Sequence, residues 1–576
     1  MSLTQEGCTG KQTIATLGQP VAVGWRLGLM AVVLALTSCG GGEDAGPDLI
    51  VTQTPQALLS ALPAQSTQAL LWSRTVTVPN GTDLGAAMGT LFSLDDANGV
   101  PLAAAGLLHG VQSGVSLPNR QVSFFLGHND DVASSFSQSQ AGMPKPYGPA
   151  DLFYMTAYRD TLLAFRYHRP GQVRAWQANT RTWVDFNDPA IPHDSVYPVR
   201  NVQTVANHLL VTYDQRVLWG GRPLNLRSPV FADARLFYLS GYANGRLRLA
   251  VVRKDSSDPA APVVSAGLID CEWTPPSRDV NACHYAEMPT HNGSKSIDHL
   301  LFGMHAIADG RVAAYGLNGD FLSWDGQAWV WVRKPERQAS WQVYAAADIG
   351  DRVLMGHFPS GGVLSMQADS SKNLQWVVAT TAVSSDAAVR RDEVQSLVPF
   401  GGDVLVGVWP WGELYRGHPS RGWSRFIQAF NRDARQPDAG HPYDELGMNN
   451  CLGQRIFQIL PWGRGFVYST TMKNNDTECA GAISRLSPDQ QAEYGRVMFV
   501  ERTNALTCNL VWTPGAAMLT FGVTKDHHMV VNQDGRELCS APFSSPDLLA
   551  RLIQWPAGAG GSAAAGSSGL FGPMRR

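Results

Sequence analysis

Two segments in the second half of the chain repeat the same order of residue types, and this repeat constrains the fold most. Residues 350–364 read GDRVLMGHFPSGGVL, and residues 402–414 read GDVLVGVWPWGEL. Both contain a Gly-Asp turn, an apolar run that ends in Gly, an aromatic-Pro pair, a second Gly and a Leu. Gly with Asp supplies the positive φ angles of a tight hairpin. Apolar runs of this length are typical of buried strands. The repeated unit is therefore a turn followed by paired strands.

Looser copies of this unit occur at 309–324, 159–186 and 206–224, and many of them end near a Trp. The spacing of roughly 40–60 residues is that of one four-stranded propeller blade with variable loops. Charged residues make up 16% of the chain, with 57 Gly and 35 Pro, which suits an all-β protein with many turns. We expect an all-β fold, a β-propeller of six or seven blades. Several unrelated β domains are the alternative.

Two short motifs resemble known propellers. The stretch GVWPWGELY, with EVQSL before it, resembles a motif of uncharacterised bacterial propeller-type proteins, and it implies a fold but no activity. The residues Asp325-Gly326-Gln327-Ala328-Trp329 resemble the turn–Trp element of kelch and sialidase-type propellers. The match to a sialidase box lacks one spacer residue, and a sialidase arginine triad cannot be placed. The resemblance therefore carries no sialidase activity to this chain.

The N-terminal segment resembles a bacterial lipoprotein signal. Arg26 precedes a short apolar run that ends in Leu36-Thr37-Ser38-Cys39. The run is too short to span a bilayer but suits a signal-peptide core. The resemblance to a lipobox implies cleavage before Cys39, with palmitate or a similar lipid on that cysteine. Gly40 and Gly41 imply sorting to the outer membrane of a Gram-negative bacterium, on a side that the sequence leaves open. An ordinary secretory signal with a chance cysteine is the alternative.

Composition changes suggest five segments. They are a signal peptide at 1–38, a flexible Gly-rich tether at 39–53, an N-terminal cap or first blade at 54–149, the propeller at 150–555 and a disordered tail at 556–576. The formal net charge is −3, and no basic stripe points to a nucleic-acid partner.

Six cysteines remain after Cys8 and Cys39 are set aside. An even number in an exported chain indicates disulfides. Fifteen pairings are open, and the simplest joins sequence neighbours: Cys271 with Cys283, Cys451 with Cys479, and Cys508 with Cys539. A metal site is the rival interpretation, but no CxxC pair is present and the histidines His284, His291, His299 and His305 are irregularly spaced. We expect no metal and no cofactor.

The loops of the repeated unit hold the candidate ligand-binding residues. They are His357, Phe358, Trp409, Trp411 and Glu413. Equivalent loops lie side by side around a propeller axis, where aromatic faces stack on sugars and a carboxylate accepts hydrogen bonds. The alternative is that these aromatic residues pack between blades.

No nucleophile elbow, P-loop or metalloprotease motif is present. We therefore expect a membrane-anchored cell-envelope propeller that binds a carbohydrate or an envelope protein through its loop face without catalysis. The rival is a carbohydrate-active enzyme that uses Glu413 with Asp392 or Glu393. A scaffold for envelope assembly is a third hypothesis.

Overall fold

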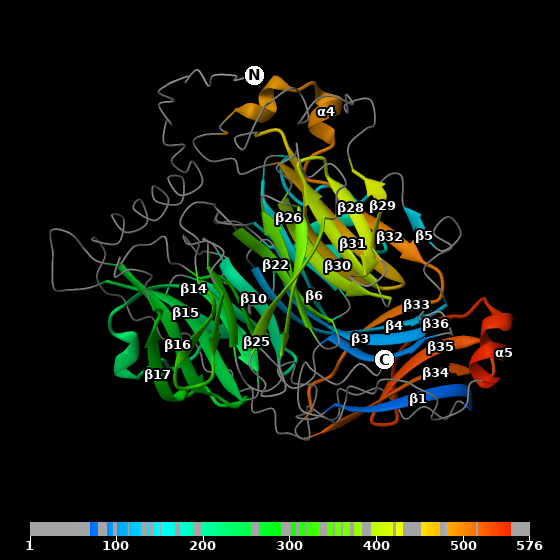
Figure 1. Cartoon of the computed structure of the whole chain (residues 1–576), viewed down its shortest axis with the longest axis horizontal. Helices are drawn as coiled ribbons and strands as arrows, with labels where there is room; N and C mark the ends of the chain where they lie inside the picture. The colour runs from blue at the N-terminus through cyan, green and yellow to red at the C-terminus, as the bar shows by residue number, and fades with distance from the viewer. Residues whose placement is uncertain are drawn as a thin grey trace, which may run out of the picture.

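The computed structural model shows a chain built almost entirely of antiparallel strands (Figure 1). It describes residues 69–554 with gaps, of which the longest are 79–88, 290–300, 383–392 and 430–450. The prediction of an all-β protein is confirmed. The predicted signal peptide, Cys39, the tether and the C-terminal tail lie outside the described residues.

Within the described residues, the middle of the chain forms seven groups of four strands, here called sheets 1 to 7. Each of the first six uses four consecutive strands. Sheet 1 consists of β6 (Phe153–Tyr158), β7 (Thr161–Arg166), β8 (Arg174–Gln177) and β9 (Thr182–Asp185). Sheet 2 consists of β10 (Val199–Val205), β11 (His208–Tyr213), β12 (Arg216–Trp219) and β13 (Arg222–Pro223). Sheet 3 consists of β14 (Ala234–Ala243), β15 (Arg246–Lys254), β16 (Val264–Glu272) and β17 (Asn281–Glu287).

Sheets 4 to 6 follow the same pattern. Sheet 4 consists of β18 (Leu301–Ala306), β19 (Val312–Gly316), β20 (Phe321–Trp324) and β21 (Trp329–Arg333). Sheet 5 consists of β22 (Gln342–Ile349), β23 (Arg352–Phe358), β24 (Gly362–Ala368) and β25 (Leu374–Ala382). Sheet 6 consists of β26 (Glu393–Phe400), β27 (Asp403–Trp409), β28 (Glu413–His418) and β29 (Gly422–Gln428).

Sheet 7 takes its outer strand from a distant part of the chain. Three of its strands are β30 (Gln454–Trp462), β31 (Gly465–Met472) and β32 (Val497–Arg502), and the fourth is β5 (Phe136–Gln138). Strand β5 precedes sheet 1 in the sequence and pairs antiparallel with β32. A segment from before the first sheet thus completes the last one.

The first strand of each sheet lies against the first strand of the next. The contacts run from β6 to β10, β14, β18, β22, β26 and β30 in turn, and β30 also lies against β6. Buried apolar side chains fill the space between adjacent sheets, as where Leu405 and Leu414 of sheet 6 pack with Ile456 of sheet 7. The sheets therefore face one another in chain order.

Polar side chains on the first strands join neighbouring sheets. Asn201 of β10 donates from Nδ2 to the Ser240 carbonyl of β14 at 2.6 Å. Ser396 of β26 donates from Oγ to the Ile456 carbonyl of β30 at 2.8 Å. Each buried side chain satisfies a backbone group at the inner edge of the next sheet, where no ladder partner exists.

The pair that joins the last sheet to the first is the most complete of these contacts. Gln458 of β30 donates from Nε2 to the Met155 carbonyl of β6 at 2.7 Å, and its Oε1 accepts from the Met155 amide at 2.5 Å. Gln458 is 1% exposed. One side chain therefore takes the place of a strand at this seam.

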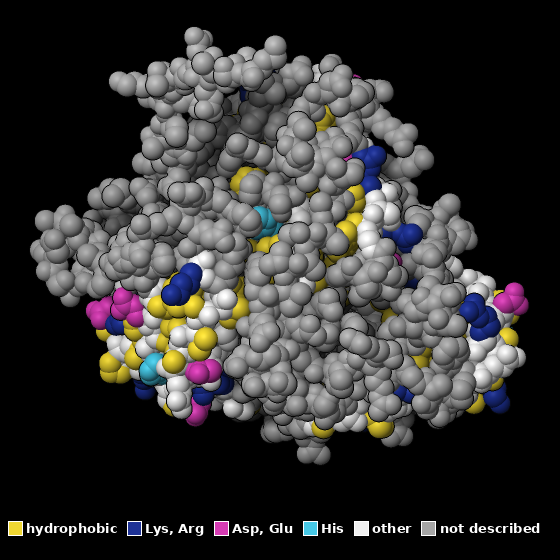
Figure 2. All heavy atoms as spheres, viewed as in Figure 1, with side chains coloured by type: hydrophobic (Ala, Val, Ile, Leu, Met, Phe, Trp, Pro, Cys, Tyr) yellow, Lys and Arg dark blue, Asp and Glu magenta, His cyan; other side chains and the backbone are white. Residues whose placement is uncertain are grey.

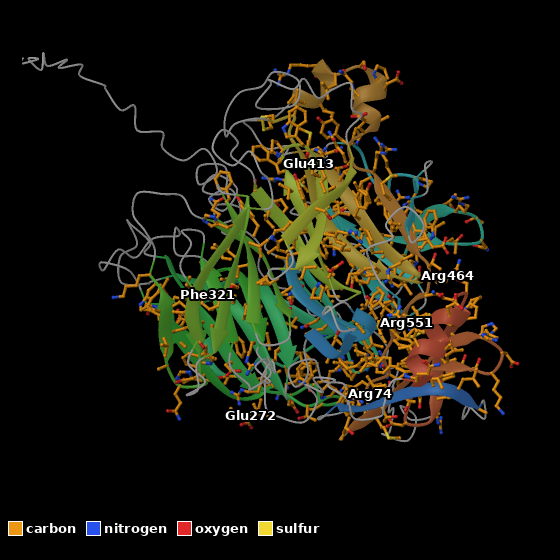
Figure 3. All side chains as sticks on the ribbon, turned by 45° about the vertical axis from the view of Figure 1, so that its right-hand side comes forward. Arg74, Glu272, Phe321, Glu413, Arg464 and Arg551 are labelled. Carbon is orange, nitrogen blue, oxygen red and sulfur yellow. A yellow bond between two sulfur atoms is a disulfide. The ribbon has the colours of Figure 1, made fainter. Side chains whose placement is uncertain are left out.

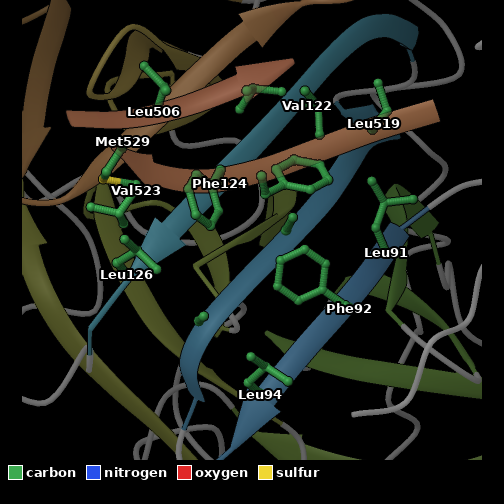
Figure 4. Close-up of a cluster of buried hydrophobic side chains, with 14 of the residues drawn as sticks. Leu91, Phe92, Leu94, Val122, Phe124, Leu126, Leu506, Leu519, Val523 and Met529 are labelled. Carbon is green, nitrogen blue, oxygen red and sulfur yellow. The ribbon is translucent and has the colours of Figure 1, made fainter. Parts of the chain in front are cut away.

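The two ends of the described chain build a β-sandwich beside the seven sheets. One layer is β1 (Leu70–Val78), β34 (Ala517–Thr524), β35 (His528–Gln533) and β36 (Arg536–Pro542); the other is β2 (Gly89–Asp95), β3 (Pro101–Gln112), β4 (Val115–Leu126) and β33 (Ala505–Asn509). Phe92 and Phe124 lie between the layers (Figure 4), and both rings contact Phe521. Helix α5 (Pro546–Gln554) adds Leu548, Leu549 and Leu552 to this core.

A long hairpin, β3 with β4, belongs to both parts of the molecule. Near its base, β3 pairs with β2 and β4 pairs with β33. Farther out, β3 pairs with β22 of sheet 5 through Val111 with Ala346 and Gly110 with Ala347. Strand β4 also lies against β6, β10, β14 and β18, and β3 lies against β18, β22, β26 and β30. The hairpin as a whole therefore contacts the first strand of every sheet.

Three disulfides confirm the predicted pairing of sequence neighbours. Cys271–Cys283 lies within sheet 3, and Cys451–Cys479 ties the start of β30 to the segment before β32. Cys508–Cys539 links β33 to β36 and so joins the two layers of the sandwich. In the part of the chain that the structure describes, no helix has the length and apolar character needed to cross a membrane.

The sandwich core sets a stability test. Phe124 is fully buried, and replacing it with Ala should lower the free energy of unfolding by about 3–5 kcal/mol, because both transfer and cavity costs apply. Thr77→Ala, at an exposed position of β1, is the matched control and should change it by less than about 0.5 kcal/mol. Urea titration measures both. Equal values for the two variants would contradict this core.

Candidate functional site

The end of the sheets away from the sandwich holds the residues singled out from the sequence. The first strands β22, β26 and β30 begin there, at Gln342, Glu393 and Gln454. Figure 3 places Glu413 at this end, whereas Arg551 of α5 and Arg74 of β1 lie at the sandwich. We call this end the loop face.

The aromatic residues of the repeat pack into the protein instead of lining an open site. Phe358 and Trp409 form one cluster with Tyr344 of β22. Their exposed fractions are 4% and 1%, and those of His357 and Trp411 are 1% each. A ligand cannot stack on rings that other side chains cover. The burial favours packing between blades, the alternative weighed for these residues, and a ligand-binding role for them stays a prediction.

Gly356 and Gly407, which end the repeated apolar runs, occupy equivalent positions two residues before the ends of β23 and β27. A Cβ on Gly356 would lie 2.4 Å from a Val394 methyl, and one on Gly407 would lie 2.3 Å from the Ser396 hydroxyl and 2.6 Å from Ile456. Both contacts are with a first strand. The repeated glycine therefore reflects a close approach between strands, because a side chain at this position would keep the strands apart.

Glu413 is held by two partners on its own sheet. Its Oε1 accepts from Arg425 Nη1 at 2.6 Å, and its Oε2 accepts from the Tyr415 hydroxyl at 2.9 Å. The Glu413 side chain is 2% exposed, whereas the Arg425 side chain is 39% exposed. Both oxygens are engaged and shielded. These two hydrogen bonds account for a glutamate at this position, and a bound substrate is not needed to explain it.

Glu393 forms a second neutralised pair at the start of β26. Arg455 of β30 lies with Nη2 3.4 Å from Glu393 Oε1, and the two side chains are 13% and 5% exposed. This pair crosses from sheet 6 to sheet 7. It adds a charged contact to the loop-face end of the same interface that the Ser396 hydrogen bond joins.

Tyr344 completes this polar cluster. Its hydroxyl donates to Gln342 Oε1. Burial, together with the nearby negative charge of Glu393, raises the pKa of the Tyr344 phenol well above its ordinary value of 10.0, and Arg455 partly opposes the rise. The phenol is therefore a neutral donor over the physiological range.

A small capping unit covers the loop face beside β30. It comprises a 3-10 turn at Ala482–Arg485 and helix α4 (Pro488–Ala492), which Ser487 and Gln490 start with a capping box. The Cys451–Cys479 disulfide and Tyr494 belong to its buried core. Gln454 donates from Nε2 to the Glu493 carbonyl at 2.6 Å and so fixes the unit to β30.

The structure brings together some of the predicted residues and adds others. Phe358 and Trp409 meet, and Glu393 pairs with Trp409 across the strands. Asp392 lies outside the described residues, and Glu413 has Arg425 as its salt-bridge partner. Tyr344, Arg425 and Arg455 were missed, because a single tyrosine or arginine on a strand carries no spacing signal. The EVQSL segment contained Glu393, but its partner lies 62 residues farther along the chain.

The predicted histidine group can be followed at His284, because the side chain of His305 also lies outside the described part of the structure. His284 stacks on Trp324 with ring centroids 5.8 Å apart, and His291 and His299 lie outside the described residues. Among the residues that the structure describes, no group of three or more His, Cys, Asp or Glu side chains could hold a metal ion.

The described surface around sheet 3 carries both signs of charge (Figure 2). Arg246 contacts Asp270 at 2.9 Å and Glu272 at 3.6 Å. Arg253 contacts Asp233 at 2.9 Å. Alternating charges of this kind form local pairs and do not create a one-sided field.

Comparison with known proteins gives no family. No family model matches the chain, and no curated protein matches it. Among solved structures, a luciferin-regenerating enzyme aligns with 66% of this chain and 98% of its own length, at 10% identity and a TM-score of 0.30. A protein from Lactobacillus plantarum aligns over 56% and 95%, at 12% identity and a TM-score of 0.31. A putative oxidoreductase (glucose dehydrogenase) from Thermus aligns over 63% and 99%, at 8% identity and a TM-score of 0.26. Overlaps this loose assign neither a fold nor an activity.

The Tyr344 phenol predicts a specific alkaline response. Below pH 10 the phenol is protonated in the folded and unfolded states alike; above it, the unfolded state releases its proton first. Folding stability therefore falls as the pH rises above about 10, by up to about 1.4 kcal/mol per pH unit. Tyr344→Phe removes this contribution, so its unfolding free energy should decline less steeply.

Urea titrations of both proteins between about pH 8 and 11 measure the difference. Other tyrosines such as Tyr147 and Tyr285, whose pKa values partial burial also raises, are present in both proteins and cancel. Parallel curves above pH 10 would show that Tyr344 is not buried as described.

Proposed function

We propose that the seven sheets close into a seven-bladed β-propeller. Three observations support closure: the first strands contact one another in order and return from β30 to β6, Gln458 joins these two strands, and β5 completes sheet 7 from the N-terminal side. A strand from one end that completes the blade of the other holds a ring shut.

We propose domain boundaries that differ from those expected at 54–149 and 150–555. Strands β1 and β34 pair along nearly their whole length, and β4 pairs with β33. The sandwich then consists of residues 70–126 with 505–554, and the propeller lies between them. The N-terminal segment is neither a blade nor a separate cap in this division.

We propose that the propeller is exported and held to a membrane by lipid on Cys39. The three disulfides support an oxidising compartment. The stretch between Cys39 and β1 leads to the sandwich, so the loop face lies at the far end of the molecule from the tether. A Gly-rich tether at 39–53 spans roughly 20 Å.

We propose that the protein binds a partner at its loop face without catalysis. The carrying observation is that Glu393 and Glu413, the two described carboxylates singled out from the sequence, are both buried and each paired with an arginine. A glycosidase needs two carboxyl groups that reach a sugar from opposite sides of a cleft. The arginine partners of Glu393 and Glu413 support binding over hydrolysis, and a role for Asp392 stays a prediction because this residue lies outside the described part of the chain.

Membrane attachment is tested by Cys39→Ser in the full chain. Without the thiol no lipid can be attached, so we expect the variant to move from the membrane pellet to the soluble envelope fraction. Cys8→Ser, which removes the other cysteine outside the disulfides, is the control and should stay with the membrane. Pelleting of the Cys39 variant in a folded form would contradict the proposal.

Binding at the loop face is tested by a photo-crosslinking amino acid placed in the lipid-anchored protein in intact cell envelopes. Asp489 of α4 is exposed on the capping unit, and Val330 of β21 is 53% exposed on the outer edge of sheet 4. We expect a discrete adduct from position 489 and none from position 330. Adducts from position 330 alone, or from neither position, would overturn the loop face as the binding surface.

A further inference from the structure

We propose that the β3–β4 hairpin is a built-in occupant of the propeller's axial channel, so that no ligand or partner strand can bind there. The proposal rests on the ring closure argued above. It goes beyond the proposed function because it places a part of the chain itself in the central opening that a ring of strands leaves along its axis. Its basis is the contact of one hairpin with the first strand of all seven sheets in the described structure.

The hairpin enters from the sandwich end and points toward the loop face. Strand β22 begins at the loop face with Gln342, and its partner on β3 advances toward that end, since Gly110 pairs with Ala347 and Val111 pairs with Ala346. Gln112, the last residue of β3, therefore lies nearer the loop face than these pairs.

The base of the hairpin is fixed by polar contacts as well as by its ladder. Gln121 donates to Asn509 at 3.2 Å, and the hydroxyls of Ser123 and Thr507 are 3.0 Å apart. Both Gln121 and Ser123 are buried, at 3% and 1% exposed. A hydrogen-bonded and buried base cannot slide out of the ring without breaking these contacts.

The entry point carries a buried arginine that belongs to the last blade. Arg502 ends β32, is 1% exposed, and donates from Nη2 to the Gly127 carbonyl at 3.3 Å. Its guanidinium lies 5.0 Å above the Phe125 ring, and that ring meets Phe400 of sheet 6 with centroids 4.5 Å apart. The side chains at the mouth therefore attach the hairpin to two blades.

Strand β3 makes the backbone pairing that a strand from a binding partner would otherwise make. The inner edge of a first strand presents unpaired backbone N–H and C=O groups, which an added strand can pair. In sheet 5 the chain's own β3 takes this edge, so that β22 is an interior strand. A partner strand is therefore excluded from the inner edge of β22.

Hydrogen–deuterium exchange on the full mature protein tests the proposal. The peptide 343–349 of β22 should be protected, because β3 covers its inner edge. In a variant with residues 109–118 replaced by Asn-Gly, a turn suited to a short hairpin, we expect its exchange to speed up by about 100-fold. The peptide 246–254 of β15, which has a partner strand on each side, is the internal control and should not change.

The outcomes separate the hairpin from the rest of the fold. Equal exchange of 343–349 in both proteins, with the control protected, would overturn the proposal, as would rapid exchange of this peptide in the unaltered protein. If the control peptide also loses protection, the shortened chain has not folded, and Val111→Pro replaces it. This variant keeps the hairpin length but clashes with pairing to Ala346, and it should expose 343–349 alone. Neither readout depends on the crosslink at position 489, so failure of the hairpin proposal is distinguishable from failure of the binding proposal.

Discussion

The structure depends on pairing between the two ends of the chain. Strand β1 pairs with β34, β4 pairs with β33, and β5 pairs with β32. Each pairing joins segments more than 360 residues apart, and closing such loops costs conformational entropy. The apolar core between the sandwich layers and the disulfide between β33 and β36 offset this cost at the place where the ends meet.

Buried polar side chains join neighbouring sheets inside the proposed ring. Asn201, Ser396 and Gln458 each bond to a backbone group of the neighbouring first strand. Inner strands have one edge without a ladder partner, and a buried backbone group without a partner is costly. Short polar side chains at the inner edge meet this need between sheets, and the β3–β4 hairpin meets it for β22. The same constraint thus explains both the polar residues and the hairpin.

The repeat that stands out in the sequence serves this architecture more than a ligand. Gly356 and Gly407 allow close approach of a first strand, and Phe358 and Trp409 fill the space between sheets 5 and 6. Equivalent environments select equivalent residues, so that a structural repeat looks like a repeated site. Functional surfaces lie in loops that vary between blades, and such loops leave no repeat to detect.

The sequence by itself determined the all-β class and the turn-and-strand unit. Among fifteen possible disulfide pairings it favoured Cys271 with Cys283, Cys451 with Cys479 and Cys508 with Cys539, which the structure confirms. These follow from local patterns: turn residues, short apolar runs and cysteines that are neighbours along the chain. The tertiary structure alone decided that Glu413 faces Arg425, that Glu393 faces Arg455, and that β3 and β4 leave a sandwich to run along seven first strands. The physical reason is that local sequence patterns do not specify contacts between residues that are far apart along the chain. A strand pattern says which residues are buried but not which distant strand buries them, so partners across sheets appear only when the chain is folded.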